Sequence, residues 1–332
     1  MYPETSATEP GPPKVRIGIS ACLLGQEVRY NGSHKRDDFL VDTFGQFVEW
    51  VPVCPEVELG MGTPRPSIRL ERFNGSGVRL RMPSTGQDFT DAMMDFSRRR
   101  VEALAALELD GYVLKKDSPS CGMERVKIYH GAGAPMKDGR GIFAQALLAR
   151  LPHLPVEEEG RLNDPLLREN FITRVFVHHR WHEGEREGWS LASLMRFHER
   201  HKLLLMARNQ SAMRRLGKLL GESDYYGDKR DSIPALAASY LAGLTETLGR
   251  PASRRGQTNV LMHLMGFISD GLDRQDRAEL VETIERYRQG LVPLVVPLTL
   301  VRHHVRRQGV SYLRDQVYLE PHPHELMLLN HV

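Results

Sequence analysis

Short apolar runs alternate with longer helical patterns along the first half of the chain. The runs VRIGIS (15–20), FVEWVPV (47–53) and GYVL (111–114) are rich in β-branched residues and short enough to be buried strands. Apolar residues at helical spacing fill residues 91–109 and 141–151. Because strands that alternate with helices form βαβ units, the pattern predicts an α/β domain with a mostly parallel sheet.

The second half has a different pattern, in which helices follow one another. Helical periodicity covers residues 164–181, 190–208, 232–248 and 278–290, and we find no comparable strand pattern. Ser190 is a good N-cap and Gly290 a good helix stop. We therefore expect an all-α domain. The predicted order is a disordered tail (1–13), the α/β domain (14–152), a linker (153–163) rich in proline and glutamate, and the helical domain (164–332).

Length and composition agree with two folded domains. The chain has 332 residues, of which 41% are hydrophobic and 26% charged, as in soluble globular proteins. The first thirteen residues lack the basic start and apolar run of a signal peptide. The most apolar later stretch, residues 290–301, is too short to span a bilayer and contains two prolines. We expect a cytoplasmic protein without a membrane partner.

The three cysteines occupy similar positions. Cys22 and Cys54 directly follow predicted strands, and Cys121 lies seven residues beyond a third. In a parallel, Rossmann-like sheet, the carboxyl ends of the strands share one edge, where ligands bind. An odd cysteine count without CxxC argues against disulfides and against a sequence-local zinc ribbon. The pattern predicts one shared site, and the alternative is three unrelated buried cysteines.

The residues around the cysteines suit an iron–sulfur site. The segments SACLLG, CPEVELG and DSPSCG each place a cysteine in a turn with proline, serine or glycine. Three thiolates would leave one iron of a four-iron cluster open, and an open metal position is typical of catalytic sites. Glu56, Ser118 and Ser120 would add groups that handle protons. Their alternative roles are a surface carboxylate and turn formers.

Three motifs in this half resemble the thiouracil desulfurase family. They are ISACLLGQEVRYNG (19–32), PVCPE…GTPRP (52–66) and KKDSPSCG (115–122), and the resemblance covers about residues 14–152. It implies a [4Fe-4S] cluster whose open iron takes sulfur from a thiocarbonyl, with water supplying the oxygen. The implied cluster ligands are Cys22, Cys54 and Cys121.

The same resemblance implies a catalytic glutamate and a catalytic serine, and residues near the mouth of the site are candidates for binding the substrate. Glu56 and Ser118 correspond to the catalytic glutamate and serine, with Glu58 and Ser120 as close rivals. The candidate substrate-binding residues are Asn31, Arg65, Lys115, Lys116 and Ser120. The cations among them would attract a phosphate or an anionic base, or else form an ordinary solvated rim. The chain departs from the family at LGMGTPR (59–65), where two adjacent glycines are expected, and this leaves the substrate open.

The helical half carries more positive charge. Residues 161–332 hold 25 Lys/Arg against 20 Asp/Glu, whereas residues 1–160 hold 20 against 22. This excess suits nucleic-acid contact, although ordinary solvated helix faces would also explain it. The candidate RNA-binding residues, taken from clusters, are Arg254, Arg255, Arg302, Arg306 and Arg307. The pairs His178/His182 and His198/His201 have metal-ligand spacing, but partly buried polar histidines explain them better.

This half resembles the YbgA-like helical domain over residues 162–325. The segments DPLLRENFITRVF, NVLMHLMGF, YRQGLVPLVVPLTLVRHH and YLRDQVYLEPHP carry the resemblance. The two-domain layout implies removal of sulfur from 4-thiouridine in tRNA, with the helical part binding the RNA. One alternative is the same chemistry on free thiouracil or a small thionucleotide. A second is a nucleic-acid-binding protein with a structural or sensory cluster and no turnover.

Overall fold

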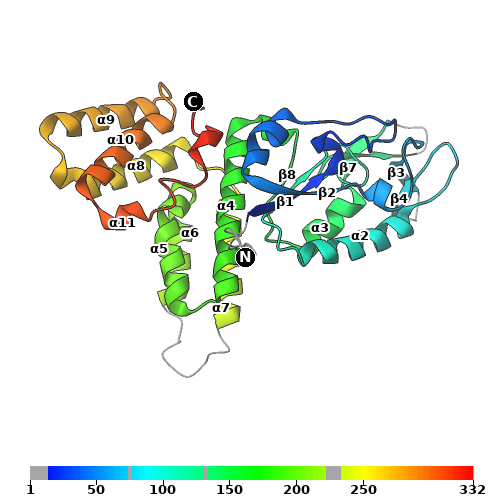
Figure 1. Cartoon of the computed structure of the whole chain (residues 1–332), viewed down its shortest axis with the longest axis horizontal. Coiled ribbons are helices and arrows are strands. Elements are labelled where there is room, and N and C mark those ends of the chain that lie inside the picture. Colours follow the sequence, from blue (N-terminus) through cyan, green and yellow to red (C-terminus); the bar gives the residue numbers. More distant parts are fainter. Residues whose placement is uncertain (1–13, 74–76, 131–133, 222–232, 332) are drawn as a thin grey trace, which may run out of the picture. The chain divides into compact units, whose positions relative to one another are not determined.

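The computed structural model describes residues 14–73, 77–130, 134–221 and 233–331 (Figure 1). The chain divides into two compact units, residues 1–146 and 147–332. The tail predicted for residues 1–13 lies outside the described residues.

The first unit is built on a sheet with β1 at its centre. The order of its strands is β2-β1-β5, and β1 pairs in parallel with both β2 and β5. Side chains on both faces of β1 are buried, which explains its continuous apolar run. The predicted α/β class is confirmed. The strands of the first unit in this sheet are β1 (Val15–Ser20), β2 (Val48–Val53) and β5 (Gly111–Leu114), and strand β8 (Val156–Glu158) belongs to residues 147–332.

A second sheet was not predicted. Its order is β4-β3-β6-β7, in which β3 and β6 are parallel and the outer strands pair antiparallel. Leu70, Leu80, Val126 and Ile128 form its buried core together with Met93 of α2. Its strands are β3 (Arg69–Phe73), β4 (Gly77–Arg81), β6 (Val126–Tyr129) and β7 (Met136–Gly139), and the helices of this half are α1 (Pro55–Glu58), α2 (Thr90–Ala105) and α3 (Ile142–Arg150).

The second unit is mainly helical, as predicted. Asp164, Ser190, Ser253 and Asp273 cap four of the helices with their side chains. The stretch expected to be a linker, 153–163, contains strand β8 and a short 3-10 turn. The helices are α4 (Pro165–Glu187), α5 (Leu191–Arg208), α6 (Gln210–Gly221), α7 (Ile233–Leu248), α8 (Arg254–Ile268), α9 (Arg274–Arg288), α10 (Val295–Gln308) and α11 (Ser311–Arg314).

These helices enclose one large apolar core. Trp181 of α4 is almost fully buried and lies against Trp189, Phe197 and Tyr240. Further along the core, α8, α9 and α10 pack on one another. Across the described ranges, none of the helices combines the length and the apolar character needed to cross a bilayer.

Candidate active site

The ends of three neighbouring parallel strands bring the cysteines to one place. Cys22 follows β1 in a 3-10 turn closed by Gly25, whose φ of 90° favours glycine. Cys54 follows β2 as the N-cap of α1, and Cys121 lies in the loop after β5. All three line a single cavity of about 460 Å³. The predicted meeting of the cysteines at one sheet edge is therefore present in the structure.

The loop that carries Cys121 is fixed to the start of α3. Carbonyl oxygens of Pro119, Ser120 and Gly122 accept hydrogen bonds from the backbone N–H groups of Ile142, Ala144 and Gly141. Because the first N–H groups of a helix have no partner within it, the loop satisfies α3 while α3 orders the loop. These backbone contacts help to set the position of Cys121.

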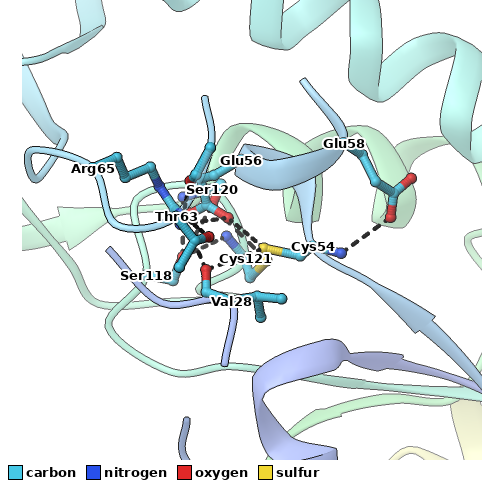
Figure 2. A network of polar contacts seen from close by, with 10 residues as sticks. Val28, Cys54, Glu56, Glu58, Thr63, Arg65, Ser118, Ser120 and Cys121 are labelled. Atoms are coloured by element: carbon cyan, nitrogen blue, oxygen red, sulfur yellow. Dashed lines mark hydrogen bonds and ion pairs between the residues drawn. The ribbon is translucent and has the colours of Figure 1, made fainter. Parts of the chain in front are cut away.

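The structure distinguishes Glu56 from Glu58 (Figure 2). Glu56 is 9% exposed and lines the cavity, and its Oε2 lies 3.5 Å from the Sγ of Cys54. Glu58 points away. Its Oε1 accepts the N–H of Cys54 at 3.1 Å, and its Oε2 lies 2.8 Å from Nε of Arg100 on α2. Glu56 therefore faces the site, whereas Glu58 holds the Cys54 backbone in place.

Both candidate serines belong to one chain of hydroxyls. The fully buried Ser120 donates its hydroxyl to Oε1 of Glu56. The Ser120 and Ser118 hydroxyl oxygens lie 3.0 Å apart, and Ser118 is the one that lines the cavity. The Ser118 Oγ also accepts the N–H of Cys121 at 3.1 Å. Ser118, Ser120 and Glu56 thus form a continuous path for a proton from the cavity to a buried carboxylate.

Arg65 positions the carboxylate from the other side. Its Nη2 lies 3.9 Å from Oε2 of Glu56, and the two side chains are 6% and 11% exposed. Its Nη1 donates to the carbonyls of Val28 (3.0 Å) and Gly62 (2.9 Å). These two carbonyls hold the buried guanidinium of Arg65, and with it a positive charge, beside the Glu56 carboxylate.

Burial keeps two of the thiols protonated in the absence of a metal. Burial, followed by the charge of Glu56, raises the pKa of the Cys54 thiol to about 12. The same two causes raise the pKa of the Cys121 thiol well above its ordinary value. Burial therefore disfavours the thiolate forms of Cys54 and Cys121 in the metal-free protein, and a metal bound by these sulfurs would favour them.

The remaining predicted residues of this half differ in position. Lys115 and Lys116 line the cavity. Asn31 is exposed and is not among the residues that line the cavity. Its Oδ1 accepts hydrogen bonds from the N–H and the hydroxyl of Ser33 within a turn. Ser20 was not predicted. Its Oγ accepts the N–H of Lys115 at 2.9 Å, which links the end of β1 to the loop after β5. The only signal in the sequence is its place two residues before Cys22.

The five candidate RNA-binding arginines fall into two groups. Arg254 is partly buried, donates to the carbonyl of Tyr287 at 2.9 Å and lies over its ring. Arg302 is partly buried and donates to the carbonyl of Leu319. Arg255 and Arg306 are exposed, and Arg307 is exposed with Asp276 3.8 Å away. The exposed group is available to a partner, whereas the other two arginines contact the fold.

The histidine pairs are arranged differently from each other. The rings of His178 and His182 lie 4.4 Å apart between centroids. His198 lies 3.0 Å from the hydroxyl of Tyr240, whereas Nδ1 of His201 lies 2.7 Å from the carbonyl of Phe197. The second pair therefore belongs to the helix packing, in agreement with the expectation of partly buried polar residues.

Two family models match separate parts of the chain. Residues 17–159 match the model described as 2-thiouracil desulfurase. Residues 202–323 match a model described as a protein of unknown function, DUF1722.

Relatives divide in the same way. The chain is 31% identical over 155 residues to the uncharacterized protein YbbK of Bacillus subtilis (strain 168), covering 45% of this chain and 99% of that protein. It is 29% identical over 167 residues to the uncharacterized protein YbgA of Escherichia coli (strain K12), covering 48% and 92%. A solved structure, the [4Fe-4S]-dependent thiouracil desulfidase TudS, is 36% identical, with a TM-score of 0.37, and the match covers 46% of this chain and 95% of that one.

Proposed function

The chain belongs to the 2-thiouracil desulfurase family, and from this premise we propose that it is a [4Fe-4S]-dependent desulfidase acting on 4-thiouridine in tRNA. The observation that carries the proposal is the cavity in which three cysteines meet a buried carboxylate and two hydroxyls. The net reaction replaces the thiocarbonyl sulfur with oxygen. It consumes one water and releases one hydrogen sulfide, and no oxidant or reductant is needed.

The cavity suits an iron–sulfur cluster. Cys22, Cys54 and Cys121 would hold it, because they are the three thiols that the strand ends bring to one cavity wall. Three protein ligands leave one iron position open, as catalytic metal sites require. Thiols are the soft ligands that iron–sulfur clusters use, so the donor set fits the group. When bound, the cluster supplies a soft Lewis acid with affinity for a thiocarbonyl sulfur.

The protein's own residues handle the proton and the water. Glu56 accepts the proton of the attacking water as general base, a role that typically contributes about 10²–10⁴-fold in rate. Ser118 meets the substrate at the cavity wall. Ser120 passes the proton of the attacking water from Ser118 to Glu56. Arg65 lies beside the carboxylate and stays in place through its bonds to the backbone. The Glu56 and Arg65 side chains are 11% and 6% exposed, and burial of this kind strengthens the interaction between their charges.

The tRNA substrate is supported by the chain's second unit. This unit has an excess of positive charge and exposed arginines at positions 255, 306 and 307. Five cations also line the cavity, against two carboxylates. The cavity cations are Arg29, Lys35, Arg65, Lys115 and Lys116. Phosphates of an RNA strand would balance the positive charge of the helical unit and that of the cavity, whereas a free base would balance neither charge.

The test uses full-length protein loaded with iron and sulfide under anaerobic conditions. It is incubated with tRNA that contains 4-thiouridine and, separately, with free thiouracil. Mass analysis of the nucleosides should show uridine in place of 4-thiouridine, and about four irons per chain should accompany the activity. Cys22→Ala, Cys54→Ala and Cys121→Ala should each lose iron and activity together. Turnover of free thiouracil alone would contradict the tRNA part, and full activity in one cysteine variant would contradict the ligand assignment.

A further inference from the structure

We propose that Tyr30 is a stacking platform for the nucleobase adjacent to the reacting one, so that the site favours a thiopyrimidine within an RNA strand over a mononucleotide. The proposal rests on the proposed function and adds a residue that selects the class of substrate. Tyr30 would bind the neighbouring nucleotide and take no part in the chemistry.

Tyr30 lies where the cavity meets solvent. It lines the same cavity as the three cysteines, yet 46% of it is exposed. By contrast, Phe44, Tyr112 and Phe143 of the same unit are fully buried in the core. A large ring left half in water at the entrance of a reactive cavity is free to accept a planar partner.

The turn that carries Tyr30 is rigid. The backbone N–H of Arg29 donates to the carbonyl of Ser33, and the N–H of Gly32 donates to the carbonyl of Arg29. The carbonyl of Tyr30 accepts the N–H of Arg65 at 2.7 Å, and Arg65 is the residue that faces Glu56. The backbone that carries the ring is therefore tied to Arg65 and through it to the carboxylate, so little of the turn has to be ordered when a base binds.

A cation accompanies the ring. The guanidinium of Arg29 lies 5.8 Å from the centroid of Tyr30, and its Nη1 donates to Oγ of Ser33 at 3.1 Å. An arginine held beside an aromatic ring is a usual partner for stacked bases and their phosphates. Because the cavity wall is cationic overall, a strand that enters it would bring its phosphates along this rim.

These features favour a strand over a single nucleotide. The reacting ring must enter the cavity to reach the thiols and Ser118, so it leaves the exposed part of Tyr30 uncovered. A base attached through the next phosphate can cover that part, and a mononucleotide has no such base. Stacking of one base on an aromatic side chain, judged by alanine substitution, corresponds to roughly 5- to 150-fold in affinity.

The experiment compares two substrates of the loaded, full-length enzyme. One is a short RNA with a single 4-thiouridine, and the other is 4-thiouridine 5′-monophosphate. Tyr30→Ala should lower kcat/KM for the RNA by about 10- to 100-fold and change the value for the mononucleotide by less than about threefold. Tyr30→Phe should resemble the parent. Met94→Ala, at another exposed apolar position of this unit, should change neither value.

A modified RNA makes the test specific. Replacing the base on the 5′ or the 3′ side of 4-thiouridine with an abasic site should weaken the parent enzyme by the factor that Tyr30→Ala removes. One of the two positions should have no further effect on Tyr30→Ala. Equal losses on both substrates, no loss on either, or a parent that converts only the mononucleotide would overturn this proposal. A parent that converts neither substrate would instead overturn the proposed function, and this proposal with it.

Discussion

Two glutamates separated by one residue have different surroundings in this site. Successive residues of a helix turn by about 100°, so Glu56 and Glu58 point in nearly opposite directions from α1. Glu56 enters the cavity and accepts from Ser120, whereas Glu58 bonds the Cys54 N–H and pairs with Arg100. The pair therefore offers a matched comparison between a group proposed to handle protons and a group that positions the backbone.

We predict that Glu56→Gln keeps the iron and loses turnover, by about 10²–10⁴-fold, because an amide cannot accept the proton. Glu58→Gln should keep most of its activity, since an amide oxygen can still accept from Cys54. Iron and sulfide content together with kcat measured on tRNA checks both. Equal rates in the two variants would remove Glu56 from the proton path.

The sequence could identify the three cysteines but not these contacts. Cys22, Cys54 and Cys121 follow strands, and the parallel order of β2, β1 and β5 makes their convergence predictable. The bond between Ser120 and Glu56 joins residues 64 apart, and it depends on how the loop after β5 docks on α3. Spacing alone contains no information on that docking.

At the scale of elements, the docking of the Cys121 loop on α3 requires glycine at position 141. A Cβ at Gly141 would lie 2.3 Å from the carbonyl oxygen of Ser120 and 2.8 Å from the backbone nitrogen of Cys121. Both neighbours are backbone atoms of the cysteine loop, so the loop would have to move. Its movement would displace a proposed cluster ligand and the hydroxyl that serves Glu56.

Gly141→Ala should therefore lower the stability by about 1–3 kcal/mol and reduce the iron retained after gel filtration. A control is Gly266→Ala in α8, where the Cβ meets nothing within 4 Å. That variant should be slightly more stable, by about 0.5–1 kcal/mol, because alanine favours a helix. Unfolding in denaturant and iron analysis measure both effects. Normal iron content in Gly141→Ala would mean that the loop can dock on α3 with a Cβ at position 141.

The strands of the second sheet could not be predicted from the pattern of apolar residues. β3 reads RLERF and β4 reads GVRLR, so arginines separate the few apolar residues of each strand. Among the residues of these strands whose burial the structure describes, Leu70 and Leu80 are the ones buried in the small core. By contrast, β1 is buried on both faces and therefore shows a continuous apolar run. Strands with one or two buried positions leave too little pattern to predict.

A buried histidine in α5 gives the helical unit a pH dependence. His201 is 1% exposed, and burial, followed by the nearby charge of Arg180, lowers its pKa from 6.5 to about 3. Between pH 6.5 and about 3 the unfolded chain binds a proton at this position that the folded chain does not. Stability should fall with decreasing pH in this range, with a slope of up to about 1.4 kcal/mol per pH unit from this residue.

His201→Leu should flatten that slope. At pH 8 the histidine is neutral in both states, so the difference between variant and parent there reports packing alone. The free energy of unfolding of the variant minus that of the parent should be about 2 kcal/mol higher at pH 5 than at pH 8. Denaturant unfolding at the two pH values measures this gain. An unchanged difference would show that His201 takes up no additional proton on unfolding.

At the scale of the whole molecule, the helical unit offers two kinds of arginine. Arg306 is exposed on α10, whereas Arg302 of the same helix is partly buried and donates to Leu319. Arg306→Gln should weaken tRNA binding and reduce the slope of log affinity against log salt by about 0.7–0.9, the value for one phosphate contact. Arg302→Gln should mainly lower thermal stability. Salt titrations of tRNA affinity compare them, and an unchanged slope for Arg306→Gln would exclude it as a phosphate contact.

The two units should also divide the reaction between them. A fragment that ends at Asn163, before α4, keeps all three cysteines, Glu56 and both serines, so it should bind the cluster. It should desulfurate a small thionucleotide at a rate within about threefold of the full chain, because the cavity residues all precede α4. It should lose most of its kcat/KM on tRNA, since the exposed arginines at positions 255, 306 and 307 are absent. Tyr30 stays in the fragment, so a preference for a short RNA over the mononucleotide should survive while the preference for whole tRNA disappears. A fragment that processed tRNA as well as the full chain would show that the helical unit has another role.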